Sequence, residues 1–458
     1  MRLRKLSELV AAKRFDSALA EHEKWTPQQV AQHQSERIDS IVRHAAASSS
    51  FYRDLYRDHV PASGHVELQS LPALDKATFV ERFDAIVTDP RLRFDELLAH
   101  VEGAEEDVLY RDEFRAIATS GSSGRKGLFV FDRACWTAIM GGFLRFLRWN
   151  GAKPAIPRRR LAYVGASGGA HMSRRVSASL DVGIHRMTML PATMPLARIV
   201  EELNRFQPDY LPGFPSMIAA LAEEQLAGRL DISPLVVSTS SELRTAEMTA
   251  TIEAAWGTTP WDLYAVTETG MVACECEEHR GLHLFEDLAV VEVVDAQGRP
   301  VPDGVVGDQL LVTSLDNRVQ PTIRLAVSDR VAIDPEPCPC GLPLRRIRGV
   351  EGRADDIIHL PSGNGRTIGV HPMQWAPVAK AREVREFQVV QEGPAVNVRV
   401  VLHPGADAAA VEERLTGELD GRLRELGVAE PIIRFRPCDD LGRDAAKMGK
   451  LKLIVADR

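Results

Sequence analysis

Apolar residues in the middle of the chain follow two alternating patterns. Short apolar runs at 161–166 and 235–242 have the length and composition of buried strands. Between and after these runs, apolar residues recur at helical spacing over 194–206, 215–228 and 245–256. Strands that alternate with helices in this way predict an α/β domain built around a sheet.

The N-terminal region has a different pattern from this middle part. The first 60 residues are mainly helical in their spacing. The segment Thr26-Pro27-Gln28-Gln29 predicts a helix start, because threonine can cap, proline fits the first turn and glutamine completes a capping box. From about residue 288 onward, apolar runs separated by glycine and proline predict β-structure.

The pattern changes again after Gly352. Apolar runs over 387–403 predict a hairpin, residues 407–426 have helical spacing, and another strand follows. We therefore expect an α/β fold with a large N-terminal domain, residues 1–352, and a small mobile α+β lid domain, residues 353–458.

Composition and charge narrow the class of protein. The 458 residues are 45% hydrophobic and 26% charged, which is typical of a soluble globular chain of two or more domains. The net charge of −8 argues against a nucleic-acid partner. The chain has no apolar run of about 20 residues, and its charged N-terminal segment does not look like a secretory signal. We expect a cytoplasmic protein with no membrane partner.

The strongest local signal is the segment 119–127, which is rich in glycine and hydroxyl side chains. Glycines let a backbone approach a phosphate closely, and successive N–H groups can bind an anion. The segment lacks the Walker A pattern, and a strand-like run rather than a helix follows it. A flexible hairpin turn explains it about as well when it is taken alone. The candidate phosphate-binding residues are Ser120, Gly121, Ser122, Ser123, Gly124 and Lys126.

Five motifs, taken in order along the chain, resemble those of the adenylate-forming superfamily of acyl-CoA synthetases, adenylation domains and luciferases. The more specific resemblance is to the phenylacetate–CoA ligase branch. The segments that carry it are 119–127 (the phosphate loop), 261–268 (similar to Y-G-x-T-E), 320–330 (similar to P-x-I-R-Y…G-D), 352–356 (G-R-x-D-D) and 449–452 (the terminal G-K).

The resemblance implies an ATP-dependent ligase that converts a small carboxylic acid, aromatic by analogy, to acyl-AMP and then to a coenzyme A thioester. An amine or a carrier-protein thiol remains an alternative acceptor, because the stretch from 357 to 371 is longer than is usual in these ligases. A more distant alternative is a zinc-bearing interaction protein with a vestigial nucleotide site. The oligomeric state is left open, a homodimer included.

The resemblance also assigns roles to residues of the large domain. Glu268 is expected to hold Mg²⁺, a hard ion that suits a carboxylate, and Thr267 to bond the α-phosphate. Tyr264 and Arg353 are expected to contact the nucleotide, and Asp329 to accept hydrogen bonds from the ribose. Without the resemblance, a helix cap would explain Thr267 and Glu268.

Two further roles fall in or beside the lid domain. Asp355 is the expected hinge on which the lid rotates between two poses. Lys450 is expected to reach the carboxylate and the α-phosphate, where a point cation suits the developing charge. Lys447 and Lys452 are close competitors for this role.

The chain has six cysteines, and four of them form two Cys-x-Cys pairs. Cys276, His279, Cys338 and Cys340 make a Cys₃His set typical of structural zinc, within a sub-structure spanning 274–340. Cys274 could replace His279, and four buried thiols without a metal remain the alternative. Other histidines, His171 and His283 among them, are expected to be incidental.

Overall fold

The computed structural model describes most of the chain. The described residues are 2–103, 108–119, 127–166, 171–353, 357–362, 367–370, 372–375, 377–378, 381–442 and 451–456.

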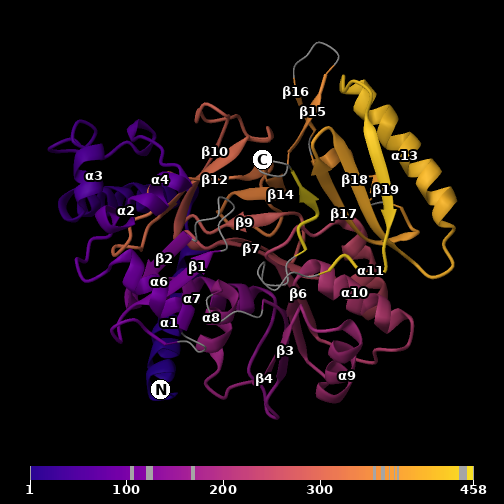
Figure 1. The fold of residues 1–458 in the computed structure, drawn as a ribbon. Helices are drawn as coiled ribbons and strands as arrows, with labels where there is room; N and C mark the ends of the chain where they lie inside the picture. Colours follow the sequence, from indigo (N-terminus) through magenta and orange to yellow (C-terminus); the bar gives the residue numbers. More distant parts are fainter. Residues whose placement is uncertain are drawn as a thin grey trace.

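Helices dominate the N-terminal region and gather on one side of the molecule (Figure 1). The predicted start of the second helix is confirmed, because the Thr26 side chain accepts from the Gln29 N–H and the capping box is complete. The helices are α1 (Arg2–His22), α2 (Pro27–Ser48), α3 (Ser50–Leu55), η1 (Leu68–Ser70), α4 (Lys76–Glu81), α5 (Phe83–Ile86) and α6 (Phe94–Gly103).

A nine-stranded sheet forms the centre of the molecule, in the order β13-β14-β9-β8-β7-β6-β5-β3-β4. The strands from β4 to β7 run parallel, and those from β7 to β13 pair antiparallel. Their bounds are β3 (Arg160–Gly165), β4 (Arg186–Pro191), β5 (Tyr210–Gly213), β6 (Val236–Ser240), β7 (Trp261–Val266), β8 (Gly270–Glu275), β9 (Leu282–Leu284), β13 (Asp329–Ile333) and β14 (Arg346–Arg353).

The helices between the parallel strands confirm the predicted α/β alternation. They are α8 (Met172–Leu180), α9 (Leu196–Phe206), α10 (Pro215–Leu226) and α11 (Ala246–Trp256), and α7 (Arg133–Trp149) precedes the first of these strands. Side chains of one strand alternate between faces, so Ala162 and Val164 pack with α9, α10 and α11 while Leu161 and Tyr163 belong to a separate cluster. On that second face the Tyr163 hydroxyl donates to Ser173 of α8, so helices contact both faces of β3.

Two smaller sheets complete this part of the molecule. The hairpin β1 (Arg115–Thr119) and β2 (Gly127–Phe131) brackets the predicted phosphate loop, with Thr119 opposite Gly127. The strand-like run expected after this segment is confirmed as β2. A three-stranded antiparallel sheet contains β10 (Ala289–Val294), β11 (Gln309–Ser314) and β12 (Leu325–Val327).

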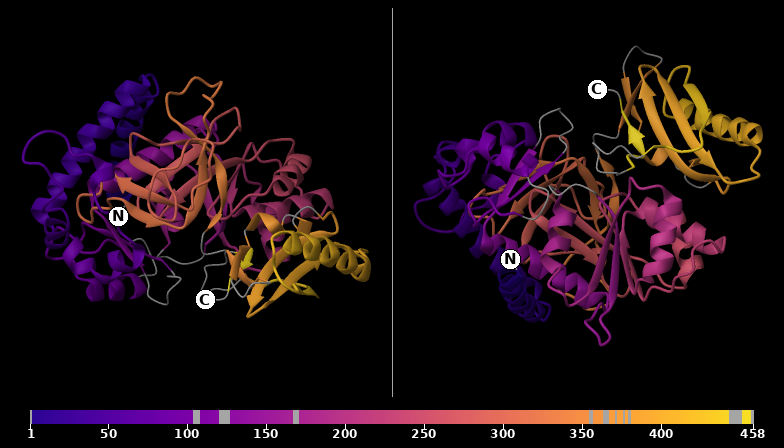
Figure 2. Two further views of the ribbon diagram at one scale, coloured as in Figure 1. Left: turned by 90° about the horizontal axis from the view of Figure 1, so that it is seen from above. Right: turned by 60° about the horizontal axis from the view of Figure 1, so that its bottom comes forward.

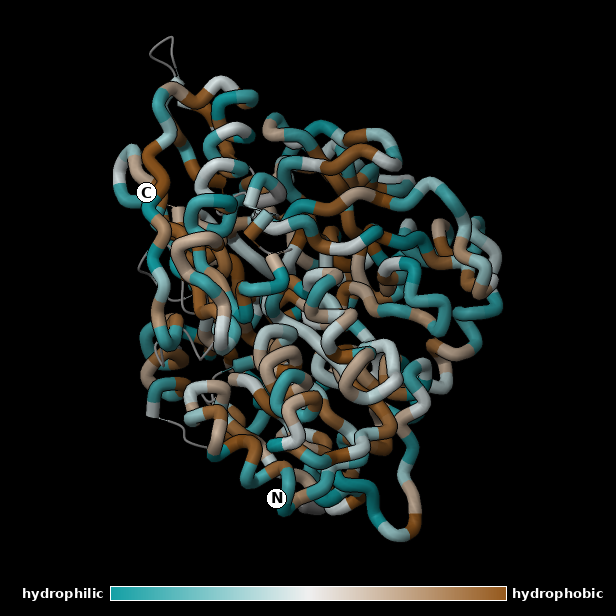
Figure 3. The backbone as a smooth tube through the Cα atoms, turned by 90° about the vertical axis from the view of Figure 1, so that its right-hand side faces the viewer, coloured by the Kyte–Doolittle hydropathy of each residue, from teal (hydrophilic) through white to brown (hydrophobic). Residues whose placement is uncertain are grey.

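The strands after residue 357 and one helix form what we call the C-terminal unit. The predicted hairpin and helix are present, and one buried cluster draws all its residues from 358 to 456. The unit stands apart from the central sheet in Figure 2, and in Figure 3 its helix lies in front of hydrophobic strands. Its elements are β15 (Ile358–Pro361), β16 (Thr367–Val370), η3 (Pro372–Trp375), β17 (Val384–Glu392), β18 (Ala395–Leu402), α13 (Ala408–Glu425), β19 (Ile432–Pro437) and β20 (Ile454–Val455).

Among the helices described, none combines the length and the apolar character that crossing a membrane requires.

Candidate active site and metal cluster

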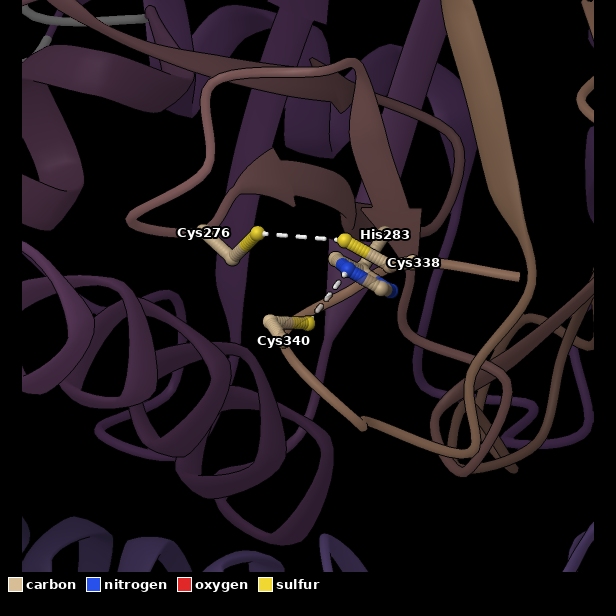
Figure 4. Close-up of side chains that lie close together, drawn as sticks. All are labelled: Cys276, His283, Cys338 and Cys340. Carbon is tan, nitrogen blue, oxygen red and sulfur yellow. Dashed lines mark hydrogen bonds between the residues drawn. The ribbon is translucent and has the colours of Figure 1, made fainter. Parts of the chain in front are cut away.

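Three cysteines and one histidine converge beside the antiparallel part of the central sheet (Figure 4). Cys276 follows β8, His283 lies within β9, and Cys338 and Cys340 lie in the segment between β13 and β14. The four ligand atoms lie within 4.8 Å of one another. We call these four residues the metal cluster, because a Cys₃His set of this size matches a tetrahedral zinc site.

Hydrogen bonding orients the histidine of the metal cluster. Its Nδ1 lies 2.9 Å from the Leu344 carbonyl oxygen, and its Nε2 lies 3.3 Å from Cys340 Sγ. A carbonyl only accepts, so Nδ1 carries the proton and the Nε2 lone pair points toward the thiols. Burial also lowers the pKa of His283, which favours the neutral form that binds metals.

The thiols of the metal cluster are crowded. Cys276 Sγ lies 3.7 Å from Cys338 Sγ. Burial, the largest cause, raises the pKa of Cys276 and raises that of Cys340 to about 12. Thiolates in this position therefore need a compensating cation, and a bound divalent ion supplies one. The donor set fits zinc.

The structure replaces one predicted ligand. His279 lies outside the metal cluster, because its Nδ1 is 3.0 Å from Glu275 Oε2 and its ring packs edge-on against Trp261. Cys274, the suggested substitute, is buried in the main hydrophobic core. The fourth residue is instead His283, which was expected from the sequence to be incidental.

The β8–β9 hairpin explains why His283 rather than His279 lies in the metal cluster. His283 stands opposite Cys274 in the ladder, so the returning strand carries its ring back toward Cys276. Gly281 makes the return possible: its φ is +107°, and a Cβ there would collide with the Ile347 carbonyl oxygen. A sequence search for a cysteine and a histidine bracketing a hairpin, rather than a short Cys-x-x-His, would have found this residue.

The expected magnesium ligand lies just beyond β7, at the carboxyl end of the parallel strands. Glu268 is buried, and its Oε1 lies 2.6 Å from Lys76 Nζ. Lys76 begins α4 and is about half exposed, 5.8 Å from the ring of Phe129. Lys76 was not among the expected site residues, because nothing in its local pattern distinguishes it from an ordinary surface lysine.

Two other expected nucleotide residues meet nearby. The Tyr264 hydroxyl donates to Asp329 Oδ2 across 2.8 Å. Asp329 is buried at the start of β13, where it pairs in the ladder with Arg353 at the end of β14. The Tyr264–Asp329 bond thus links the central strand β7 to the edge strand β13. Thr267, beside Glu268, is partly exposed.

Several predicted site residues lie outside the described part of the chain. They are Ser120, Gly121, Ser122, Ser123, Gly124 and Lys126 of the phosphate loop, the hinge residue Asp355, and Lys450 with its competitor Lys447.

Comparison with curated proteins finds relatives of similar length. Over 371 residues the chain is 26% identical to a phenylacetate-coenzyme A ligase of Thermus thermophilus, spanning 78% of this chain and 77% of that protein. A phenylacetate-coenzyme A ligase of Aromatoleum evansii is 26% identical over 57% of this chain and 60% of its own. A scan against family models gives no match.

Comparison with solved structures identifies the fold. A 2-hydroxyisobutyryl-CoA ligase in the postadenylation state superimposes with a TM-score of 0.70 at 19% identity, over 93% of this chain and 89% of that one. The same ligase in the thioesterification state, with 2-HIB-AMP and CoA, gives 0.57 over the same shares at 20% identity. The resemblance expected from the motifs is confirmed: the chain has the fold of the adenylate-forming acyl-CoA ligases, and its sequence is similar to their phenylacetate–coenzyme A ligase branch.

Proposed function

We propose that this protein is an AMP-forming acid–CoA ligase. Its carboxylic acid substrate attacks the α-phosphorus of ATP, the bond to pyrophosphate breaks, and acyl-AMP forms. The thiol sulfur of coenzyme A then attacks the acyl carbon, AMP leaves, and the thiol proton passes to solvent. An aromatic acid is the substrate class suggested by the sequence relatives.

The observation that carries this proposal is the hydrogen bond from Tyr264 of β7 to Asp329 of β13, with Glu268 just beyond the end of β7. Ligands of open α/β sheets bind beyond the carboxyl ends of parallel strands. Strand β7 pairs in parallel with β6, and Glu268 lies just beyond its carboxyl end. We call these three the nucleotide residues.

The surroundings of Asp329, Glu268 and Lys76 allow a role for each of these side chains. Asp329 accepts from Tyr264 and would also accept from the ribose hydroxyls. Glu268 would hold Mg²⁺, which neutralises phosphate charge when it is bound. In this structure the Lys76 ammonium neutralises the Glu268 carboxylate. We propose that Lys76 contacts the phosphates instead once Mg²⁺ binds Glu268.

The remaining roles complete the proposal. Residues 120–126 would hold the β- and γ-phosphates, Thr267 and Arg353 would contact the nucleotide, and Lys450 would act between carboxylate and α-phosphate. We place the division between domains at 352/353, with Asp355 as the hinge. The separate buried cluster of the C-terminal unit supports this division.

We also propose that the metal cluster holds one structural zinc through Cys276, His283, Cys338 and Cys340. Four protein ligands leave no open position for a reactive water, so the ion would stabilise the fold rather than take part in the reaction. It would tie β8 and β9 to the segment that joins β13 to β14.

The direct test is pyrophosphate release across a panel of aryl and alkyl acids, with and without coenzyme A. We expect release with an aryl acid and ATP, and a thioester only when coenzyme A is present. Release without any thioester would move the acceptor to an amine or a carrier-protein thiol. No release with any acid would contradict the proposed function.

A pair of variants separates the two half-reactions. Lys450→Ala should abolish adenylate formation yet still convert pre-formed acyl-adenylate to thioester, because the lysine acts only in the first transition state. Asp355→Pro should retain adenylation and lose transfer, since it stiffens the hinge. A misfolded protein would lose both. If Lys450→Ala keeps the first half-reaction, the role passes to Lys447 or Lys452.

A further inference from the structure

The Glu242 carboxylate links the large N-terminal part of the molecule to the C-terminal unit. Glu242 follows β6, and its Oε1 accepts from the Leu451 backbone N–H at 2.8 Å. Its Oε2 accepts from the Ser216 hydroxyl at 2.5 Å and lies 3.3 Å from the Ser216 amide nitrogen. Both oxygens of Glu242 are therefore engaged, one toward each part of the molecule.

Both partners of Glu242 are held firmly in their own parts of the fold. Ser216 lies in the first turn of α10 and is buried, and the N-terminus of a helix favours a negative charge. Leu451 buries its side chain among Val401 and Leu441 of the C-terminal unit. The carboxylate thus connects two well-packed elements, so the hydrogen bond fixes one against the other.

The Glu242–Leu451 contact lies next to a residue with a proposed catalytic role. Leu451 directly follows Lys450, the residue proposed to act only during adenylation. The overall arrangement superimposes better on a ligase in the postadenylation state than on the same ligase in the thioesterification state, with TM-scores of 0.70 and 0.57. The Glu242–Leu451 contact belongs to the first arrangement and must break if the C-terminal unit rotates.

We propose that Glu242 is a positioning residue that holds the segment after Lys450 against α10 in the adenylating pose, and that its release permits the transfer pose. This inference rests on the proposed ligase function. Glu242 would thus influence the relative rates of the two half-reactions, although it lies in the large part of the molecule rather than at the hinge.

A second, longer contact lies on the same face of α10. His403 Nε2 of the C-terminal unit is 3.8 Å from Glu223 Oε1. Ser216 and Glu223 are seven residues apart, which places them two turns apart on one side of the helix. The side of α10 that faces the C-terminal unit therefore carries both contacts, and Glu242 provides the closer one.

The test compares the two half-reactions in Glu242→Ala and Glu242→Gln. We expect Glu242→Ala to slow ATP–pyrophosphate exchange roughly tenfold, the effect of losing about 1.4 kcal/mol from one hydrogen bond to a charged group. Thioester formation from pre-formed acyl-adenylate should stay within about twofold of wild type or increase. Glu242→Gln, whose amide oxygen can still accept from Leu451, should keep most of the exchange activity.

The two half-reactions also separate positioning from nucleotide binding. Both use the same adenylate, so a direct contact from Glu242 to the nucleotide would raise the KM for acyl-adenylate in the second half-reaction as well. Equal losses in both halves would overturn the proposal. Glu201→Ala, which removes an exposed carboxylate of α9 bonded within its own helix, is the matched control and should leave both halves unchanged.

Small-angle X-ray scattering tests the same contact without any substrate. We expect Glu242→Ala to shift the protein toward more extended shapes, with Glu242→Gln and Glu201→Ala unchanged. Wild-type scattering in Glu242→Ala would overturn the positioning role even if the ligase activity is confirmed. If no acid is turned over by wild type but the scattering shifts, the proposed function fails while the contact stands.

Discussion

The metal cluster and the nucleotide residues lie on the same nine-stranded sheet but draw on very different lengths of chain. The cluster is contained within residues 276–340 and takes nothing from the C-terminal unit. The nucleotide residues are completed by Lys76 from the N-terminal helices and, in our proposal, by Lys450 from the far end of the chain. We therefore expect the metal cluster to stay intact if the domains rotate, whereas in our proposal the nucleotide site is complete only in one arrangement.

This difference predicts opposite responses to substitution. Changes in the metal cluster should affect stability and metal content, with little effect on which half-reaction runs. Changes at the nucleotide residues and at the contacts of the C-terminal unit should affect the half-reactions, with little effect on metal content.

Glu268→Gln should have the largest effect. It removes the charge of the proposed magnesium ligand but keeps the side-chain shape, so pyrophosphate release should fall roughly 100-fold or more. Zinc content should not change, because the metal cluster has its own ligands. Near-wild-type release at limiting Mg²⁺ would remove Glu268 from the mechanism.

His283→Ala should have the next largest effect, on stability rather than on nucleotide binding. We expect purified wild type to carry about one zinc per chain and the variant to carry little, with the midpoint of thermal unfolding lowered by roughly 5 °C or more. The KM for ATP should change much less.

His279→Ala is the matched control for the metal cluster, because His279 is bonded to Glu275 instead. It should retain zinc. Loss of zinc in His279→Ala but not in His283→Ala would restore the ligand set expected from the sequence, and wild type without zinc would refute the site altogether.

Lys76→Met should have a smaller, metal-dependent effect. It leaves the buried carboxylate of Glu268 without its partner, which should lower the free energy of unfolding by about 1 kcal/mol in EDTA, given that the lysine is half exposed. Saturating Mg²⁺ should recover part of this loss if the ion occupies the same carboxylate. An equal loss of unfolding free energy with and without Mg²⁺ would show that Mg²⁺ does not replace Lys76 at the Glu268 carboxylate.

Glu223→Gln should have the smallest effect, and it depends on pH. Burial raises the pKa of Glu223 to about 7, above its ordinary value of about 4.3. The groups that face it are Arg385, Glu386 and His403 of the C-terminal unit and Glu224 and Arg229 of the large part.

A raised pKa means that the folded protein binds the proton more tightly than the unfolded chain does, so this favourable contribution to stability is complete below about pH 4.3 and is lost as the pH rises through about 7. Glu223→Gln should therefore raise the free energy of unfolding by about 1 kcal/mol at about pH 7.5 and hardly at about pH 5, as measured by chemical denaturation. An identical change at both pH values would show that the Glu223 carboxyl does not titrate in this range.

Local patterns in the sequence predicted most of the secondary structure and the class of the fold. The predicted strands at 161–166 and 235–242 correspond to β3 and β6, and the helix predicted at 245–256 is α11. These features depend on capping, apolar spacing and turn residues, which act over a few neighbouring positions. The order of the family motifs along the chain likewise indicates the ligase fold.

The sequence alone could not determine which side chains meet. His279 and His283 are four residues apart, and only the β8–β9 pairing brings the second one to Cys276. Lys76 faces Glu268 across 192 positions, and Glu242 meets Leu451 across 209. Such contacts depend on how helices and sheets pack, and packing selects partners by shape and burial rather than by spacing along the chain. The sequence therefore determined the elements and the motif order, while the tertiary structure decided the fourth residue of the metal cluster and the contacts that hold the C-terminal unit.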